Sequence, residues 1–322
     1  MKRILVFTAL FTMVCVGFGA TAALAQPFPS HPIQLLTPGT AGFMQDVSCR
    51  QFAEEVSKVL GKPLVVANKP GGSMTIAVDA VARAKKDGYT ILYASGSPLV
   101  YVPNTKPQIV PYNTFKDLEP LGGWAIMAFT VAVKKDAPWN TFQELVEYAK
   151  KNPKKLRVGS TGALTTDNFN VEIVKAATGA EFTVVPLSMH PTVALLGGHV
   201  EVIFNPITET AKYAKGGQFR ILLLSTKLPS FPNVPTLSSL GYKEDMITGW
   251  FAFFAPSGIP AGPKKILVSA IEKAFKNPQV KEKVEKLEFF VEYKSPEEFL
   301  KLLKAEYGRA GDIVKKMGLK TK

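Results

Sequence analysis

Few side chains in this sequence could act as a catalytic base, a nucleophile or a metal ligand. The histidines are His31, His190 and His199, and no G-x-S-x-G, H-E-x-x-H, C-x-x-C or phosphate-binding loop accompanies them. We expect each histidine at the surface or in a turn. Cys49 lies three residues before Phe52 on the apolar stripe of an expected helix, which favours a core position over a nucleophile. The sequence therefore favours binding over catalysis, with no metal and no cofactor.

Two loops rich in Gly, Ser and Thr are the best candidates for a binding site. They span residues 37–46 and 159–166, and each joins the end of an expected strand to the start of an expected helix. Unpaired backbone N–H groups and the helix dipole favour an anion at such a start. In open α/β sheets, ligands bind beyond the carboxyl ends of the strands. Two such loops, one in each of two lobes, predict a cleft that holds an anionic group.

The elements that position these loops are strands alternating with amphipathic helices. Residues 33–36, 64–67 and 90–94 are strand-like, and a helical stripe lies in each interval between them. This βαβαβ order predicts a parallel sheet with helices on both faces. A second series of the same kind begins with the strand expected at 126–133 and ends with the strand expected at 220–224. The fold class is therefore α/β with two lobes, each a mostly parallel sheet flanked by helices.

The order of segments along the chain also predicts the lobe boundaries. A Pro-rich stretch at 228–235, followed by an apolar run at 250–255, indicates that the chain leaves the second lobe and returns to the first. We expect lobe 1 to comprise 26–124 and 250–322, and lobe 2 to comprise 125–249. The C-terminal helices are expected to pack on the lobes and to do no chemistry.

The first 25 residues have the organisation of a secretory signal peptide. Lys2 and Arg3 form a cationic start, residues 4–19 carry no charge, and 23–25 read Ala-Leu-Ala, a typical cleavage site. Cleavage after residue 25 predicts a soluble periplasmic protein. A membrane anchor and a lipid on Cys15 are the alternatives.

The charge balance permits several kinds of partner, and the predicted export narrows them. The chain has 39 Lys and Arg against 26 Asp and Glu, a formal net charge of +13 at pH 7. Much of this excess lies in 264–322 on amphipathic helices, where a solvated face is the ordinary explanation. An exported chain without a nucleic-acid-binding motif is a poor candidate for nucleic acid. Only Cys49 remains after cleavage, so no intrachain disulfide is expected.

Beyond these patterns, the sequence resembles the substrate-binding proteins of tripartite tricarboxylate transporters, the Bug family. The resemblance implies a periplasmic two-lobed clamshell of the Venus flytrap type. It also implies that a small carboxylate is held between the loops of the two lobes, with ordered waters, and delivered to membrane permease subunits. The matching segments are 29–33, the loop closing in Asp46, 68–72, 87–90, 112–118, 159–166, 195–202, 232–236 and 250–258.

Departures from the family pattern bear on the ligand. Gly42-Phe43 stands where the family commonly has two glycines, and Ala163-Leu164 stands where Asn-Gly is usual. Residues 186–190 lack the lysine of the corresponding family segment. These changes make the expected pocket more apolar, which disfavours citrate or malate. We expect a monocarboxylate with an aromatic or aliphatic body that touches Phe43 or Leu164.

The expected ligand contacts come from both lobes. Backbone N–H groups and hydroxyls supply the donors. Asp46 is expected to cap its helix, because a carboxylate beside an anionic ligand repels it. The candidate ligand-binding residues are Thr40, Ala41, Gly42, Phe43, Ser95, Gly96 and Ser97 in lobe 1, and Ser160, Thr161, Ala163, Leu164, Thr165, Thr166 and Asn205 in lobe 2.

We therefore expect a non-enzymatic periplasmic solute-binding protein. Its expected partners are a small organic acid and the cognate permease subunits, with no nucleic acid. A periplasmic hydrolase or isomerase acting in the same cleft is one alternative, although no base is placed near a nucleophile in the sequence. A protein that presents its ligand to a sensor kinase is another, because it would use the same fold.

Overall fold

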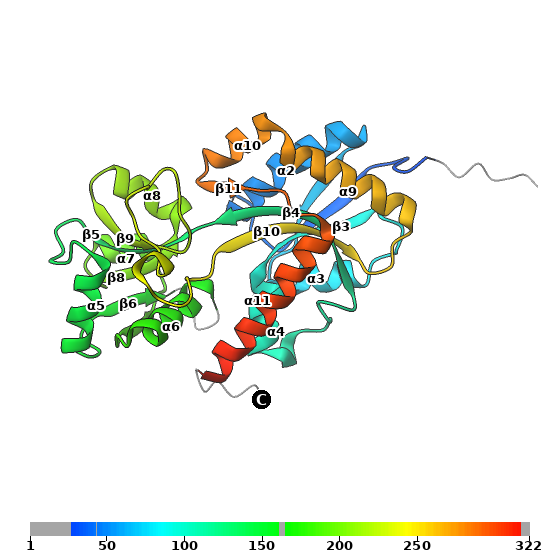
Figure 1. Cartoon of the computed structure of the whole chain (residues 1–322). Coiled ribbons are helices and arrows are strands. Elements are labelled where there is room, and N and C mark those ends of the chain that lie inside the picture. Colours follow the sequence, from blue (N-terminus) through cyan, green and yellow to red (C-terminus); the bar gives the residue numbers. More distant parts are fainter. Residues whose placement is uncertain (1–26, 43, 161–164, 317–322) are drawn as a thin grey trace, which may run out of the picture.

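The computed structural model describes residues 27–42, 44–160 and 165–316. The predicted signal peptide lies outside the described residues. Two α/β lobes, each built on its own sheet with flanking helices, lie next to each other and are joined by extended segments (Figure 1).

Lobe 1 is built on a six-stranded sheet. The predicted βαβαβ order is confirmed, because β1 pairs in parallel with both β2 and β3. Helices α2 and α3 provide the two crossovers. The strands in spatial order are β11 (Phe289–Val291), β4 (Leu118–Met127), β10 (Gly249–Pro256), β3 (Thr90–Ser95), β1 (Ile33–Thr37) and β2 (Leu64–Asn68). The helices are α2 (Met44–Leu60), η1 (Gly72–Met74), α3 (Thr75–Ala82), η2 (Ser97–Tyr101), α4 (Val102–Thr105), η3 (Pro107–Ile109), α9 (Ala261–Lys276), α10 (Pro278–Glu285) and α11 (Pro296–Lys316).

Lobe 2 is built on a five-stranded sheet. Strand β6 pairs in parallel with both β7 and β8, so their carboxyl ends meet at one edge. The strands in spatial order are β7 (Thr183–Pro186), β6 (Arg157–Ser160), β8 (Val202–Pro206), β5 (Phe129–Lys134) and β9 (Phe219–Leu224). The helices are α5 (Phe142–Lys151), α6 (Thr166–Thr178), α7 (Pro191–Leu196), α8 (Ile207–Lys215) and η4 (Ser238–Leu240).

Both sheets are mixed, where the sequence predicted mostly parallel ones. The strand predicted at 126–133 is divided at Ala128, so that β4 belongs to lobe 1 and β5 to lobe 2. Strand β10 returns from lobe 2 and lies antiparallel between β3 and β4, and β5 lies antiparallel between β8 and β9. These strands enter their sheets without a helical crossover, and antiparallel pairing does not require one. The lobe boundaries at 125 and 250 stay a prediction.

Local helix signals in the sequence are confirmed by the hydrogen bonds at two helix starts. The Glu144 backbone N–H donates to Oγ1 of Thr141, 3.2 Å away, at the start of α5. At the start of α11, the Ser295 backbone N–H donates to Oε2 of Glu298 at 2.8 Å, and the Glu298 N–H donates back to the Ser295 hydroxyl. Each of these hydrogen bonds satisfies a backbone N–H group that the helix leaves unpaired.

The core of lobe 1 includes a group of aromatic side chains beneath α2. The rings of Phe52 and Phe275 stack with their centroids 4.1 Å apart, and Tyr93 and Phe253 pack beside them. Cys49 is fully buried in this cluster, and burial raises the pKa of its thiol far above the ordinary range. The core position predicted for Cys49 is therefore confirmed.

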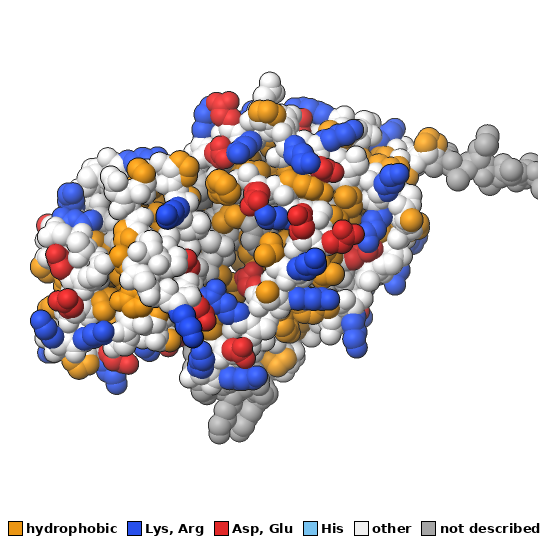
Figure 2. Space-filling view, viewed as in Figure 1, with side chains coloured by type: hydrophobic (Ala, Val, Ile, Leu, Met, Phe, Trp, Pro, Cys, Tyr) orange, Lys and Arg blue, Asp and Glu red, His pale blue; other side chains and the backbone are white. Residues whose placement is uncertain are grey.

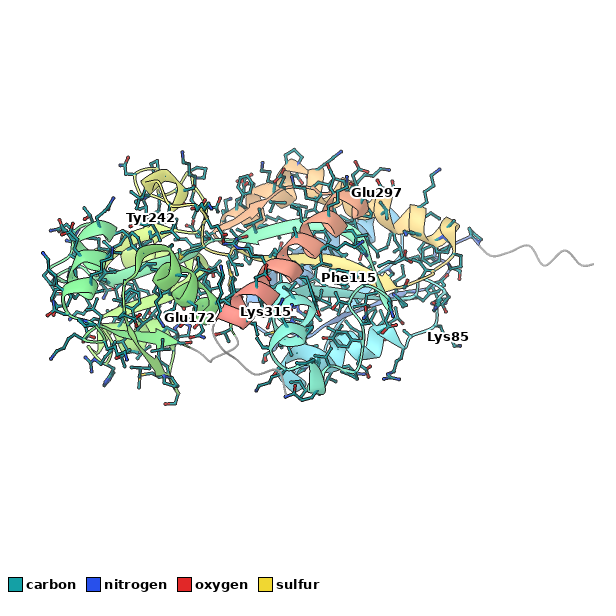
Figure 3. The ribbon with its side chains drawn as sticks, turned by 60° about the horizontal axis from the view of Figure 1, so that its bottom comes forward. Lys85, Phe115, Glu172, Tyr242, Glu297 and Lys315 are labelled. Atoms are coloured by element: carbon teal, nitrogen blue, oxygen red, sulfur yellow. The ribbon has the colours of Figure 1, made fainter. Side chains whose placement is uncertain are left out.

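The C-terminal helices pack on lobe 1, and α11 extends beyond it. Helix α11 lies against β4, η2 and α4, and its far end reaches α6 of lobe 2. Glu172 of α6 and Lys315 of α11 mark this boundary in Figure 3. Figure 2 shows Lys and Arg interspersed with Asp and Glu over the face drawn, as a solvated surface would be. In the described part of the chain, no helix has the length and apolarity needed to cross a membrane.

Candidate functional site

A cavity of about 610 Å³ lies between the two lobes. Its walls come from the carboxyl ends of β1, β3 and β8, from the starts of α2, α6, α7 and α8, and from the strands that pass between the lobes. Of the candidate residues, those that line it are Thr40, Ser95, Gly96, Ser97, Thr165, Thr166 and Asn205. The cleft between the lobes is thus where both sequence-predicted loops lead.

Other candidates lie elsewhere. Ala41 and Gly42 are exposed and do not line the cavity, and Ser160 is buried and does not line it either. Gly42 has a φ of +82°, a conformation that a glycine adopts without strain, and its N–H points to Asp46. Phe43, Thr161, Ala163 and Leu164 lie outside the described residues. Ligand contact by any of these candidates stays a prediction.

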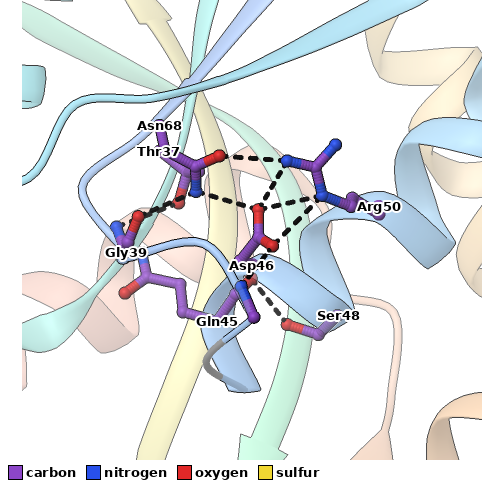
Figure 4. A network of polar contacts seen from close by, with 8 residues as sticks. Thr37, Gly39, Gln45, Asp46, Ser48, Arg50 and Asn68 are labelled. Carbon is purple, nitrogen blue, oxygen red and sulfur yellow. Dashed lines mark hydrogen bonds and ion pairs between the residues drawn. The ribbon is translucent and has the colours of Figure 1, made fainter.

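Asp46 holds the first loop in place (Figure 4). Its side chain lines no part of the cavity and the residue is 3% exposed. Its carboxylate accepts hydrogen bonds from the Gly42 N–H at 2.9 Å, from Asn68 Nδ2 at 2.8 Å and from Arg50 Nε at 3.0 Å. Asn68 Nδ2 also donates to the carbonyl of Gly39. Burial by itself would raise the pKa of Asp46, but these donors outweigh it and hold the pKa below its ordinary value.

The floor of the cavity is formed by aromatic side chains that a buried carboxylate positions. Glu306 of α11 accepts a hydrogen bond from Trp250 Nε1 at 2.6 Å and another from the Tyr101 hydroxyl. Burial raises the pKa of Glu306 above its ordinary value. A Cβ on Gly96 would lie 3.2 Å from the Trp250 ring, so a glycine is what permits this approach. Sequence reasoning missed this role of α11, because Glu306 lies far from both partners in the chain.

The lobe 2 wall carries a polar cluster of His190, Glu209 and Asn205. His190 Nε2 lies 3.0 Å from Oε2 of Glu209, and Asn205 Nδ2 donates to the same oxygen at 3.0 Å. His190 is an exposed residue at the start of α7, as predicted, but it also lines the cleft, which the sequence did not indicate. Glu209 was missed. Its place in the first turn of a helix that follows a strand end was the available signal.

The rest of the lining is largely apolar and carries no basic side chain. Met44, Met74, Met127, Phe129 and Met189 contribute apolar surface. None of the described residues that line the cavity is a lysine or an arginine. An anion in this cleft would therefore be held by neutral donors and by the starts of helices.

The start of α6 supplies donors of this kind. Thr165 occupies the residue before the helix with an extended backbone, and Thr166 is the first helical residue. Both line the cavity and are half-buried. The Thr166 hydroxyl makes no hydrogen bond to the described residues, so it is available to a ligand.

A second cavity, of about 550 Å³, lies between α6 and the end of α11. Its lining mixes lysines and glutamates and includes no strand end. In the described part of the chain, no three His, Cys, Asp or Glu side chains gather as a metal centre requires. The interlobe cavity is therefore the candidate site.

Two α/β lobes that enclose a cleft at their strand ends define a two-lobed solute-binding protein. The model of the tripartite tricarboxylate transporter family receptors, TctC, matches residues 48–319. The chain belongs to this family of solute-binding receptors. The fold and the family expected from the sequence are confirmed.

Relatives and solved structures agree with this assignment. A UPF0065 protein of Cupriavidus necator is 32% identical over 94% of this chain and 93% of its own length, and protein BugT of Bordetella pertussis is 30% identical over 78% and 79%. A structure of a periplasmic transporter has a TM-score of 0.79 at 31% identity, covering 92% of this chain and all of its own. The periplasmic binding protein BugD has a TM-score of 0.76 at 27% identity, covering 91% and 99%.

Proposed function

We propose that this receptor captures a small carboxylate in the interlobe cleft and delivers it, unchanged, to a tripartite tricarboxylate-type permease. The observation that carries the proposal is the start of α6, where Thr165 and Thr166 face a cavity whose described lining contains no lysine or arginine. Such a site binds an anion through hydrogen bonds and the helix dipole. The same donors would serve any small carboxylate that the cleft admits.

The body of the ligand is proposed from the apolar lining. Methionine side chains adapt to irregular apolar shapes, and Trp250 and Phe129 add aromatic surface. These residues favour a monocarboxylate with an aliphatic or aromatic body. Structures of two Rhodopseudomonas palustris proteins with the same fold, at 24% and 23% identity, contain adipate and malate. At that identity they show the fold alone.

A hydrolase in the same cleft is the alternative that the geometry tests most directly. Thr192 Oγ1 lies 2.8 Å from Nδ1 of His190, whose Nε2 faces Glu209, an order that resembles a nucleophile, a base and an orienting acid. Thr192 is only 2% exposed, however, so its hydroxyl does not reach a ligand in the cleft. This buried position supports binding over hydrolysis.

Capture is proposed to occur by closure of the lobes. The chain passes between them at Ala128, where β4 gives way to β5, and in the segment that ends at β10. In hinge motions, a few residues at the ends of strands or in loops take up the changes in the backbone φ and ψ angles. Export to the periplasm with cleavage after residue 25 is part of the proposal, and the two lobes, divided near residues 125 and 250, are its moving units.

The proposal is tested with an acid and its amide. Thr166→Val keeps the side-chain shape and removes the hydroxyl, so hexanoate should bind about 10- to 150-fold more weakly, the equivalent of about 1.5–3 kcal/mol for a hydrogen bond to a charged group. Binding of hexanamide should change much less. Both are measured by calorimetry, and mass spectrometry of ligand released from the purified protein should find an organic acid.

The matched control is Thr208→Val. Thr208 also lines the cavity, but its hydroxyl donates to the Met127 sulfur at 3.6 Å. It should affect hexanoate and hexanamide about equally. Equal losses of both ligands in Thr166→Val, or a released ligand without a carboxylate, would count against the proposal.

A further inference from the structure

Glu209 is a carboxylate that the lobe 2 wall presents to the cleft. It lies in the first turn of α8, lines the cavity, and its side chain is 30% exposed. Oε2 is held by His190 Nε2 and by Asn205 Nδ2, each at 3.0 Å. Oε1 makes no hydrogen bond to the described residues. One oxygen is thus fixed while the other remains available as an acceptor.

The partners that fix Glu209 are themselves well anchored. Asn205 lies near the end of β8 and is almost fully buried, and its Nδ2 also lies within 3.4 Å of the Thr210 hydroxyl. His190 Nδ1 is 2.8 Å from the Thr192 hydroxyl. The helix dipole already stabilises an acidic side chain in the first turn of a helix, without any further hydrogen-bond donors. The two extra donors therefore determine where the carboxylate points.

The surrounding charge decides what such a carboxylate recognises. Asp167 also lines the cavity, and no described lining residue is a lysine or an arginine. His190 already pairs with Glu209 through Nε2. A second carboxylate on the ligand would face Glu209 without a lysine or an arginine to offset the repulsion. An O–H or N–H group would instead donate to a charged acceptor, one of the stronger hydrogen bonds in proteins.

We infer that Glu209 determines specificity by selecting, among small carboxylates, those that carry a hydrogen-bond donor away from the carboxylate. The inference rests on the proposed carboxylate-binding function and deepens it. Dicarboxylates are disfavoured by the same residue. His190 and Asn205 act as positioning residues, because they touch Glu209.

The experiment compares three kinds of acid of equal chain length. Hexanoate, 6-hydroxyhexanoate and adipate are titrated into the protein by calorimetry at pH 7.5, together with the four-carbon set of butyrate, 4-hydroxybutyrate and succinate. In at least one set, the hydroxy acid should bind about 10-fold or more tightly than the plain acid, as expected of a hydrogen bond to a charged group. The dicarboxylate should bind the most weakly.

Glu209→Gln keeps the shape and an acceptor while removing the charge. In this variant the advantage of the hydroxy acid should fall to about threefold or less, and the dicarboxylate should bind more tightly than it does to the unmodified protein. Glu172→Gln is the matched control: Glu172 lies on α6 of the same lobe, outside the cleft, and pairs with Lys175. It should leave all three affinities unchanged.

The outcomes separate the inference from the function on which it rests. If the acids bind but Glu209→Gln leaves the ratio of hydroxy acid to plain acid unchanged, the role of Glu209 is refuted and carboxylate binding stands. The role of Glu209 is equally refuted if the dicarboxylate binds the unmodified protein most tightly. If no acid of either set binds, the proposed function fails and the inference fails with it.

Discussion

Replacing Asn170 by alanine tests how α6 is held against the segment that returns to lobe 1. Asn170 is fully buried in α6. Its Oδ1 accepts a hydrogen bond from the Ile247 N–H at 2.6 Å, and its Nδ2 donates to the Ile247 carbonyl at 3.0 Å. One side chain thus satisfies both backbone groups of a buried residue, two positions before β10 begins.

The expected magnitude follows from these contacts. Asn170→Ala removes two hydrogen bonds, each contributing about 0.5–1.5 kcal/mol, and leaves the Ile247 N–H and carbonyl buried without their partner, a desolvation cost of about 1–3 kcal/mol. We expect the free energy of unfolding to fall by about 2–6 kcal/mol, the sum of these contributions. At about 2 °C per kcal/mol for a chain of this size, the melting temperature should fall by roughly 4–12 °C.

The assay is urea unfolding followed by circular dichroism, with calorimetric melting as a second measurement. Asn152→Ala is the control, because Asn152 Nδ2 donates to the Tyr148 carbonyl at 3.1 Å near the solvent-exposed end of α5. It should cost about 0.5 kcal/mol or less. If the two variants differ by less than about 1 kcal/mol, the reasoning from buried backbone satisfaction is refuted.

Two further predictions concern titrating carboxylates. The pKa of Asp46 is held below its ordinary 3.8, so its contribution to stability is present above that value and is lost as the pH falls through the folded-state pKa. Asp46→Asn should therefore lower the free energy of unfolding by about 1–2 kcal/mol at pH 7, and urea unfolding at pH 3 should show a smaller gap; a gap independent of pH would contradict this. The pKa of Glu306 is raised above its ordinary 4.5, so its favourable contribution is full at low pH and is lost as the pH rises through the folded-state pKa. The indole N–H resonance of Trp250, assigned through Trp250→Phe, should shift with a midpoint above 4.5, and a resonance that does not titrate would argue against the contact with Glu306.

Particular helices and strands show which features of the fold the sequence could predict. The capping residues of α5 and α11 were visible because each pair lies three residues apart, and the parallel part of lobe 1 followed from strands and helices that alternate in order. The mixed sheets were not visible. The residues of strand β10 do not indicate whether it pairs with β3 in parallel or antiparallel. The antiparallel direction follows from where the chain re-enters lobe 1.

Some residues of the candidate site could also be predicted from the sequence, and others could not. Thr40, Ser95 and Thr165 could be chosen from the sequence, because the carboxyl ends of strands and the starts of helices are recognisable from local pattern. Glu306 could not be chosen, since it meets Tyr101 from 205 residues away in the chain. Glu209 likewise meets His190 only when α7 and α8 fold onto one wall.

The sequence by itself determined the class of fold, the two loops that lead into the cleft and the export signal it predicts, because these depend on spacing between near neighbours. The tertiary structure alone decided which side chains face the cleft and which lie behind it. Asp46 belongs to the first loop yet points away from the cavity, where Arg50 and Asn68 bind it. Glu209, in an ordinary helical turn, points toward the cavity. The direction of a side chain depends on the packing of distant elements, and local pattern carries no information about that packing.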